Sequence, residues 1–416
     1  MANKDLTHDM IADRFLLDLK NELTFSQNVF KGYKDEFHAV GGFKKGNSVR
    51  VKLPNKYRAK SGSAIDTVDT FERETQVTVD KQEHVALKFG MADWTLDIEG
   101  FSKKHLVPAA IALANKVDRD GLALYQDVYN LVGTPGTTPA TFAALTAAAE
   151  RLDNEAIMRE GRTGILSPKA AWALAGGDLK SVFVQDDVRR LTKKGFVGSH
   201  YAMADFFADQ NVQAHTNGTW TAGAVTVKAA PAEGATTISL QGLTATTGTI
   251  NKGDVFTIAT VAGVNPVSGI TWENGQLRQF VATATATADG AGDAVVSVSP
   301  PIYSSAAPET TLPYQTVNDL PAINDAVTLV SGVKSTTYSQ NMIYRPEAFA
   351  LTMVPFEKPR AAGAAVKWAQ ATDEDLGLSI TVADGFDISS YESITRVDIL
   401  YGWDTIQPEY AVRMTG

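Results

Sequence analysis

The feature that most constrains the fold of this chain is an abrupt change of composition near its middle. Between residues 217 and 316 only nine of one hundred residues are charged and eighteen are threonine, whereas 20% of the whole 416-residue chain is charged. Short alternating runs such as TTISLQG, DVFTIATV and AVVSVSPPI are separated by Gly, Asn and Pro. Short strands with regular turn signals are typical of an all-β sandwich or barrel. We therefore expect a separate β domain, which includes the stretch NKGDVFTIATVAGVNPV.

Mixed character returns after this β domain. Residues 336–416 contain long alternating strands with aromatic anchors, for example NMIYRPEAFALTMVPF and ITRVDILYGWDTIQPEYAVRM. These strands are too few to form an independent sheet domain, so we expect them to complete a sheet begun before residue 215. The β domain is then an insertion into a discontinuous α+β body.

The N-terminal part predicts a helix and an extended hairpin. Apolar residues recur at helical spacing, so an amphipathic helix is expected from Ile11 to about Leu23. Two alternating segments, SVRVKLP and QVTVDKQEHVALKFGMADWTL, flank a polar stretch at 55–75 that Gly and Ser interrupt. Two strands joined by such a segment form a hairpin arm, and long polar segments inside compact domains are often functional.

Three further helices are expected before the β domain. Residues 101–132 form the longest helical candidate. The next helix is predicted to begin with Thr138 as N-cap and Pro139 at the first helical position. A short strand, TGILS, precedes a helix that begins at Ser167–Pro168.

Bulk composition excludes several classes of function. A net charge of −9 argues against a surface built to grip nucleic acid, so contact with DNA should be local or weak. The absence of cysteine excludes disulfides, thiolate metal sites and cysteine nucleophiles, and it fits synthesis in a reducing cytoplasm. The first residues contain no apolar signal segment, and the stretch LVPAAIALANKV is too short to span a bilayer.

The sequence carries no recognisable catalytic or cofactor motif. Phosphate-binding, dinucleotide-binding, nucleophile-elbow and zinc-protease patterns are all missing. The six histidines are scattered without an i, i+4 pair, and the acidic triplet 373–375 lacks the spacing of a calcium loop. We expect no enzyme activity, no cofactor and no metal.

One charge pattern does point to a function. The basic stretch 44–60 is followed by an acidic limb that ends near residue 74. A hairpin with one positive and one negative limb is suited to gripping neighbouring copies of the same chain. A merely solvated loop is the alternative interpretation.

In their order, these parts resemble the major capsid (coat) proteins of tailed double-stranded DNA bacteriophages, which have the Hong Kong 97-type fold. The most similar branch is that of short-tailed-phage coat proteins with an inserted β-barrel domain. The resemblance is carried by HLVPAAIALANKVDRDGLALYQDVYNLVG (spine helix), LSPKAAWALAGGDL (axial domain), INKGDVFTIATVAGVN (barrel strand with a KGD turn) and ITRVDILYGWDTIQPEYAVRM (C-terminal return). That branch's long loop for contacts across two-fold axes has no counterpart, since the early insert KAAPAEGATTIS is short.

The resemblance implies a division of the chain. It places an N-terminal arm at 1–40, the extended hairpin loop and peripheral-domain strands at 41–100, the spine helix at 101–135, the first part of the axial domain at 136–216, the inserted β domain at 217–335 and the return segment at 336–416. The insertion is expected to stabilise the subunit or to set the geometry of the capsid.

It also implies a structural major capsid protein that self-assembles into an icosahedral head shell and passes through a procapsid. The expected partners are further copies of itself in pentamers and hexamers, a scaffolding protein, a portal protein and weakly bound packaged double-stranded DNA, with no membrane. The protein is expected in the virion after synthesis in the host bacterial cytoplasm. The expected inter-subunit contacts are Lys52, Lys56, Arg58, Lys60, Asp66, Asp69 and Glu72 of the hairpin arm and Phe15, Leu16 and Leu19 of the N-terminal arm.

Three other functions compete with this interpretation. A secreted or surface carbohydrate-binding adhesin would use the β domain as its module and would need a secretion route and an exposed aromatic platform, for which the insert offers only the tryptophans Trp220 and Trp272. Another phage structural protein, such as a tail tube subunit, would not need the long helix or the discontinuous body. An enzyme with unrecognised motifs is the third.

Overall fold

The computed structural model describes residues 8–32, 46–59, 67, 69–90, 107–176, 196–201, 204–220, 225–356, 366–373, 377–387 and 392–415. The chain forms two compact units, each built from segments that are distant in sequence. Unit 1 comprises Met1–Val51, Thr75–Leu122 and Phe349–Asp404; unit 2 comprises Lys52–Glu74, Ala123–Ala348 and Thr405–Gly416.

Unit 1 is built on a sheet of long strands. In this sheet β22 (Glu392–Thr405) pairs with β3 (Lys81–Gly90), β19 (Phe349–Met353) and β21 (Leu378–Asp387), and β21 pairs with the edge strand β20 (Val366–Asp373). Strands β22 and β3 are antiparallel, with Tyr401 opposite Lys81. Val397, Ile399 and Tyr401 are fully buried, as expected for alternate side chains on the core face of a strand.

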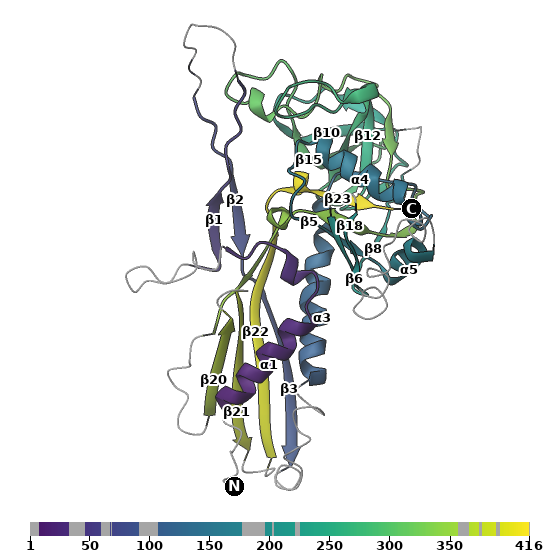
Figure 1. Ribbon diagram of the computed structural model, residues 1–416. Helices are drawn as coiled ribbons and strands as arrows, with labels where there is room; N and C mark the ends of the chain where they lie inside the picture. Colours follow the sequence, from purple (N-terminus) through teal and green to yellow (C-terminus); the bar gives the residue numbers. More distant parts are fainter. Residues whose placement is uncertain are drawn as a thin grey trace. The chain divides into compact units, whose positions relative to one another are not determined.

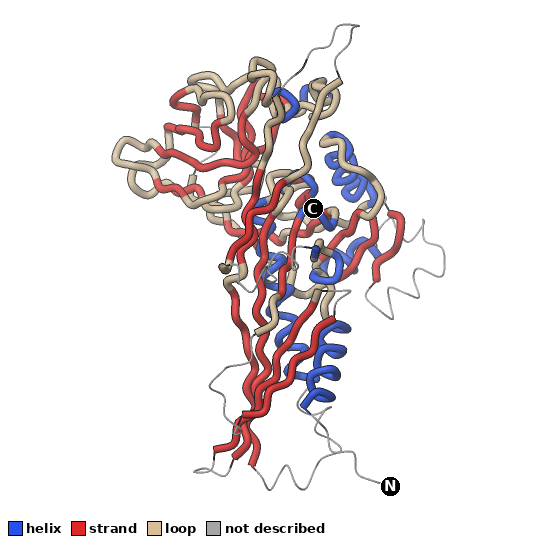
Figure 2. The backbone as a smooth tube through the Cα atoms, turned by 90° about the vertical axis from the view of Figure 1, so that its left-hand side faces the viewer, coloured by secondary structure: helices blue, strands red, loops and turns tan. Residues whose placement is uncertain are grey.

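Two helices pack on one face of this sheet (Figures 1 and 2). Helix α1 (His8–Glu22) contacts α3 (Val107–Leu122), β20 and β21. Its bounds lie close to the predicted range from Ile11 to about Leu23, because its apolar residues do recur at helical spacing and Phe15 and Leu19 are fully buried.

A buried carboxylate fixes the chain that leaves α1. Asp118 of α3 is only 2% exposed, and it accepts hydrogen bonds from the main-chain nitrogens of Thr24 (2.7 Å), Phe25 (3.2 Å) and Ser26 (3.0 Å) and from the Ser26 hydroxyl. These donors lie at the start of the 3-10 helix η1 (Ser26–Asn28), where main-chain N–H groups have no partner within the helix. The Phe25 ring then packs 5.3 Å from Trp403. Asp118 therefore attaches the N-terminal segment to α3.

The part of unit 2 that we call the axial part is a six-stranded mixed sheet. Its order is β4 (Leu131–Val132), β23 (Ala411–Met414), β18 (Asn341–Tyr344), β5 (Arg162–Leu166), β7 (Ala204–Ala208) and β6 (Phe196–Tyr201). The late strands β18 and β23 lie between strands that precede residue 215, which confirms that the return segment completes an earlier sheet. Helices α4 (Phe142–Asn154) and α5 (Pro168–Gly176) share a core cluster with Leu166, Phe206 and Val412 of this sheet.

The rest of unit 2 is mainly a closed barrel, which we call the inserted barrel. Its strand order is β16 (Val327–Leu329), β12 (Val255–Ala262), β13 (Leu277–Ala282), β15 (Ala294–Ile302), β10 (Ala235–Gln241) and β9 (Thr226–Ala229), with a small ladder of β11 (Thr249–Ile250) and β14 (Ala286–Thr287). The first and last strands also meet, because Val227 N donates to Asp325 O (3.0 Å) and Val327 N donates to Val225 O (2.9 Å). Closure joins the two edge strands of the sheet to each other, and the all-β content of these described residues agrees with the predicted all-β insertion.

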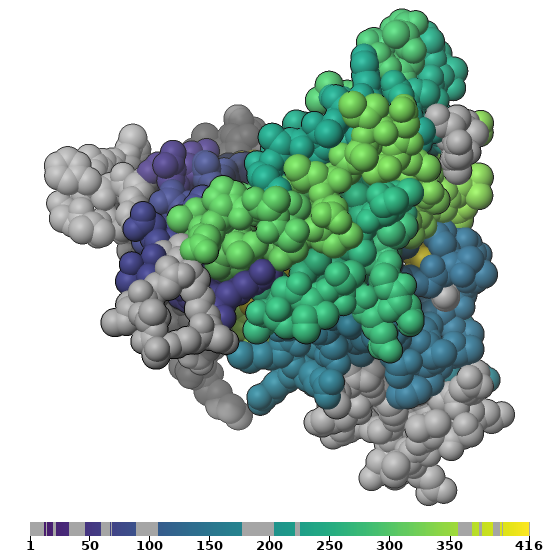
Figure 3. Space-filling model, turned by 90° about the horizontal axis from the view of Figure 1, so that it is seen from above, coloured from purple at the N-terminus to yellow at the C-terminus, as the bar shows by residue number. Residues whose placement is uncertain are grey.

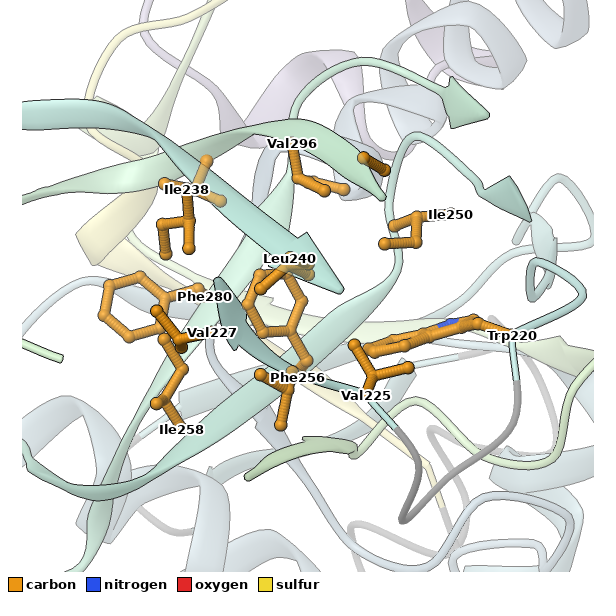
Figure 4. Close-up of a cluster of buried hydrophobic side chains, with 14 of the residues drawn as sticks. Trp220, Val225, Val227, Ile238, Leu240, Ile250, Phe256, Ile258, Phe280 and Val296 are labelled. Carbon is orange, nitrogen blue, oxygen red and sulfur yellow. The ribbon is translucent and has the colours of Figure 1, made fainter. Parts of the chain in front are cut away.

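The inserted barrel has its own hydrophobic core (Figure 4). Trp220, Phe256 and Phe280 are fully buried at its centre among Val and Ile side chains from the surrounding strands. The Trp220 and Phe256 rings meet edge to face with centroids 5.8 Å apart. This core follows from the alternation of apolar and Thr or Ser residues in the sequence, because alternate side chains of a barrel strand point inward.

The segment that enters the barrel and the segment that leaves it lie side by side. Strand β8 (Ala214–Thr216) pairs antiparallel with β17 (Thr337–Ser339), with His215 opposite Tyr338. This ladder stands immediately outside the predicted insertion, 217–335. A paired entry and exit allow a domain to be inserted without disturbing the sheet that carries it.

The predicted helix at 101–132 is too long. Helix α3 ends at Leu122 and is followed by the 3-10 helix η4 (Ala123–Asp127) and by β4, while residues 101–106 lie outside the described residues. Strand β4 runs parallel to β23, and the Gln279 side chain bonds both the nitrogen (2.7 Å) and the oxygen (2.8 Å) of Leu131. These tertiary bonds satisfy the main chain in extended form and outweigh its helix propensity.

The next helix begins later than predicted. Helix α4 starts at Phe142 with an extended Thr141 at its N-cap, rather than at Thr138 and Pro139. The nitrogen and hydroxyl of Thr137 both donate to Thr134 O, at 3.2 and 2.8 Å, so the preceding residues form a turn. The helix after β5 does begin at Pro168 as predicted, with the Ser167 hydroxyl accepting from Ala170 N at 3.3 Å.

Removing the Asp118 carboxylate should destabilise unit 1. The substitution Asp118→Ala leaves the buried nitrogens of Phe25 and Ser26 without their acceptor, and we expect it to lower the free energy of unfolding by about 3 kcal/mol. Urea unfolding followed by tryptophan fluorescence measures the loss. The control is Asp13→Ala on the exposed face of α1, and an Asp118→Ala effect no larger than that of this control would contradict the assignment.

Candidate functional site at the hairpin arm and the barrel joint

The hairpin arm rises from two paired strands. Strands β1 (Ser48–Lys52) and β2 (Glu74–Thr78) form a two-stranded sheet, which confirms the predicted hairpin. Beyond them Leu53 N donates to Arg73 O at 2.9 Å, and the exposed side chains of Lys52 and Glu72 form an ion pair at 2.5 Å. The pair joins the basic limb to the acidic limb on the outside of the arm, where solvent screens it.

The described part of the arm lies against the inserted barrel (Figure 3), where its contacts centre on the 3-10 helix η6 (Leu312–Tyr314). The Phe71 ring meets the Tyr314 ring edge to face with centroids 5.4 Å apart, and the Arg73 guanidinium lies 4.8 Å from the same ring centroid. On the other limb, Arg58 donates to the Gln315 side chain at 3.1 Å. Both limbs of the arm therefore contact one short segment of the barrel.

A buried carboxylate beneath the arm receives two of its cations. Glu409, in the 3-10 helix η8 (Pro408–Tyr410), is 8% exposed and pairs with Lys56 at 3.4 Å and Arg73 at 3.7 Å. Burial alone would raise the pKa of Glu409, but the positive charges of Lys56 and Arg73 outweigh it and hold the pKa below its ordinary value. Glu409 is therefore charged at neutral pH because the arm is in place.

The arm residues predicted from the sequence thus separate into three groups. Lys52, Lys56 and Arg58 each have a partner within the chain, namely Glu72, Glu409 and Gln315. Asp69 is exposed, and Lys60 and Asp66 lie outside the described residues. Contact of these residues with neighbouring copies stays a prediction.

The N-terminal residues predicted to contact neighbouring subunits are buried inside unit 1. Phe15 and Leu19 are fully buried and Leu16 is 9% exposed, on a helix that packs against α3, β20 and β21. Their side chains belong to the core of the unit, so they do not present a contact surface. Any contact between α1 and a neighbour would have to use its exposed face, which includes Leu17.

Buried charges hold the inserted barrel to the axial part at a place that we call the joint. Arg278 of β13 and Glu155, which follows α4, form an ion pair at 2.6 Å with both side chains at least 95% buried. The Arg278 guanidinium also lies 4.7 Å from the ring centroid of Tyr129 and 5.2 Å from that of Trp272. Burial is the largest single influence and would lower the pKa of Arg278, but Glu155 and Tyr129 together outweigh it and raise the pKa of the guanidinium.

The same joint closes the C-terminal end of α4. The carbonyl of Asn154 accepts hydrogen bonds from the Trp272 indole (3.0 Å) and from the Asn265 side chain (3.3 Å). A helix end leaves carbonyls without partners inside the helix, and here barrel side chains supply them. Arg151 stacks 4.2 Å from the Trp272 ring centroid, and burial lowers the pKa of Arg151 to about 10, so it stays charged at neutral pH.

A second set of buried polar contacts lies where the chain enters the barrel. Asp254, in the NKGD turn, is fully buried and accepts from His215 Nε2 (2.8 Å), Gly218 N (3.0 Å) and Asn251 N (2.9 Å). A Cβ on Gly218 would lie 2.1 Å from Thr249 O, so only glycine fits at this approach. The turn therefore fixes the entry strand β8 to the barrel.

Sequence reasoning missed the partners at the joint. Arg278 is the one charged residue of the strand LRQFVA, and a lone charge in a buried strand is a signal that its partner must be buried with it. No local pattern identifies Glu155, which is 123 positions away. His215 was one of six scattered histidines, and only the fold places it beside Asp254.

The two tryptophans of the insertion bear on the adhesin alternative. That alternative requires an exposed aromatic platform, but Trp220 is fully buried and Trp272 is 4% exposed. Within the described ranges no group of three or more His, Cys, Asp or Glu residues is placed to hold a metal ion. Among the described helices none is long and apolar enough to cross a membrane.

Breaking the buried pair at the joint should be costly. Arg278→Met leaves Glu155 charged and unpaired in the interior, and we expect a loss of about 3–5 kcal/mol in the free energy of unfolding. Urea unfolding of Arg278→Met, Glu155→Leu and the double variant gives the coupling between the two sites. Lys228→Met, which breaks an exposed pair with Asp293 on the barrel, is the control and should change little. Equal effects of Arg278→Met and Lys228→Met would refute the role of the joint.

The pairing of Glu409 should appear as a pH dependence. Because the pKa of Glu409 is lowered in the folded protein, its stabilisation is present above its ordinary value of 4.5 and is lost as pH falls below 4.5 through the folded value. The stability difference between the wild type and Glu409→Gln should therefore shrink from about pH 6 to about pH 3. Urea midpoints across this range test it, with the exposed Glu72→Gln as control. A difference that does not change with pH would show that Glu409 does not titrate as inferred.

Comparison with known proteins places the chain in a family. The sequence profile of the family described as "P22 coat protein - gene protein 5" matches residues 1–416. No match was found among curated protein sequences.

Similar solved structures include a chain of Mycobacterium phage Che8 (12% identity, 94% of this chain and 90% of that chain covered, TM-score 0.44) and the capsid of the cyanophage P-SCSP1u (11% identity, 94% and 91% covered, TM-score 0.39). A virus-like particle from Pyrococcus furiosus is also similar (9% identity, 97% of both chains covered, TM-score 0.39).

The profile match extends over the whole chain and confirms the resemblance drawn from the sequence. It also favours the capsid function over the adhesin, tail tube and enzyme alternatives. The chain belongs to the P22 coat protein family and is a structural major capsid protein that forms a phage head shell.

Proposed function

We propose that copies of this chain assemble as pentamers and hexamers into a closed icosahedral shell, with each hairpin arm lying over a neighbouring subunit. The observation that carries the proposal is the family match over residues 1–416, together with an arm that projects charged and aromatic side chains outward. On the arm Tyr57 is 71% exposed, and both side chains of the Lys52–Glu72 pair are more than half exposed.

The physics of a shell suits such an arm. A subunit in a closed shell is held by several neighbours at once, so contacts that are individually weak combine into a stable assembly. Exposed charges add little to the stability of one chain, but they orient partners and make association sensitive to salt. An arm with both signs of charge favours a defined register between neighbours.

Further partners follow from a head shell. A scaffolding protein would direct assembly of a procapsid, a portal protein would occupy one vertex, and double-stranded DNA would fill the interior. A net charge of −9 supports weak, non-specific contact with that DNA. Synthesis in the host bacterial cytoplasm belongs to the same proposal, as does the division of the chain with the insertion at 217–335.

Assembly itself tests the proposal. We expect the chain, expressed alone and together with a candidate scaffolding protein, to form closed or aberrant shells that sediment far ahead of the subunit and are visible by negative-stain microscopy. Assembly should slow as salt is raised, because the arm contacts are exposed. A uniform small species under all salt and scaffold conditions would overturn the proposal.

One variant isolates the arm charges. Exchanging the partners in Lys52→Glu/Glu72→Lys keeps the ion pair within the chain but inverts the charges that a neighbour meets. We expect slower assembly with unchanged subunit stability. The matched exchange Lys228→Asp/Asp293→Lys on the inserted barrel is the control. Equal assembly rates for the two exchanges would remove the arm charges from the interface.

A further inference from the structure

One hydroxyl group bonds both limbs of the hairpin arm. The Tyr314 hydroxyl donates to the carbonyl of Phe71 (3.0 Å) and accepts from the main-chain nitrogen of Lys56 (3.2 Å). Lys56 lies on the outgoing limb and Phe71 on the returning limb. Main-chain bonds of this kind fix a position along each limb, whatever the surrounding side chains are.

The buried carboxylate of Glu409 also depends on the position of the arm. Within the described part of the chain, both ion pairs of Glu409 are made with cations of the arm, Lys56 and Arg73. A buried carboxylate that loses its cations pays the full cost of desolvation, so Glu409 favours the docked arm. Arg73 makes two contacts at this place: it pairs with Glu409, and its guanidinium lies over the Tyr314 ring.

We propose that Tyr314, Gln315 and Glu409 form a docking site for the hairpin arm of the same chain, and that this site sets the direction of the arm before the subunit meets its neighbours. The inserted barrel supplies Tyr314 and Gln315, so the proposal gives the insertion a specific task in assembly. It rests on the proposed function of the arm as an inter-subunit contact.

The physical advantage is pre-organisation. A long polar hairpin that is free to move loses conformational entropy when it is ordered at an interface, and that loss weakens association. An arm already held at both limbs has lost this entropy during folding of the subunit. Docking at Tyr314 therefore lowers the entropic cost of each contact that the arm makes with a neighbour.

Crosslinking distinguishes docking within one chain from docking between chains. The chain has no cysteine, so Arg58→Cys/Gln315→Cys introduces the only two thiols, at residues that are hydrogen-bonded at 3.1 Å. A short bismaleimide should join them within the chain, in soluble subunits and in assembled shells, as identified by peptide mass spectrometry. In a co-assembly of isotope-labelled Arg58→Cys chains with unlabelled Gln315→Cys chains, we expect no crosslinked dimers.

Crosslinked dimers in the mixed co-assembly, or no crosslink within soluble subunits, would overturn the proposal. If the docking inference is wrong but the proposed function is right, shells still form in both of these outcomes. Absence of all shells would instead contradict the proposed function.

A second measurement does not depend on engineered thiols. Tyr314→Phe keeps the ring but removes the hydroxyl that bonds both limbs, and Glu409→Gln removes the charge that Lys56 and Arg73 face. We expect trypsin to cleave soluble subunits after Lys56, Arg58 and Arg73 about tenfold faster in each variant, because the limbs open more often. Tyr338→Phe is the control, since its hydroxyl accepts from Val333 N elsewhere in unit 2. Cleavage of Tyr314→Phe and Glu409→Gln at the wild-type rate would exclude the docking site.

Discussion

The organisation of unit 2 depends on a fully buried guanidinium near the end of the chain. Arg413 of β23 donates to Val128 O and to Gly253 O, both at 2.8 Å, so one side chain joins the C-terminal strand, the segment before β4 and the NKGD turn of the inserted barrel. Burial lowers the pKa of Arg413 to about 10, which leaves it charged at neutral pH. Because a buried charge needs all of its partners, these three segments must meet in one arrangement.

Buried charges also hold distant segments together at three other places in the described part of the chain. Asp118 accepts hydrogen bonds from main-chain nitrogens of the segment after α1, and Asp254 accepts one from the main chain at the entry to the barrel. Glu155 forms an ion pair with Arg278 across the joint. A purely apolar contact would tolerate small shifts between these segments, whereas hydrogen bonds to a buried charge do not. A discontinuous body with an insertion has many segments to align, and buried polar anchors supply that alignment here.

The sequence predicted those parts of the fold that depend on local patterns. Alternation of apolar residues identified the barrel strands, helical spacing identified α1, and the Ser167–Pro168 step identified the start of α5. The predicted helix ran too far because the chain changes to the 3-10 helix η4 after Leu122, and Leu131–Val132 is then held in extended form by Gln279 and by β23, which lie far away in sequence. The anchors were missed for the same reason. Glu155 carries no sign in the sequence that Arg278 lies beside it, and the docking of the arm on Tyr314 joins residues more than 240 positions apart.

The arm shows that residues of a charge pattern can have partners within the chain that the pattern itself does not identify. Lys56 and Arg58 belong to the basic limb that predicted contacts between copies, yet within the chain they contact Glu409 and Gln315. A neighbour that took Lys56 from Glu409 would have to supply another cation to a buried carboxylate, which is unfavourable. An interface that uses the outer side of the arm, with Tyr57 and the Lys52–Glu72 pair, avoids that exchange. Docking within the chain therefore leaves Tyr57 and the Lys52–Glu72 pair exposed, so the proposed contact with a neighbour does not compete with it.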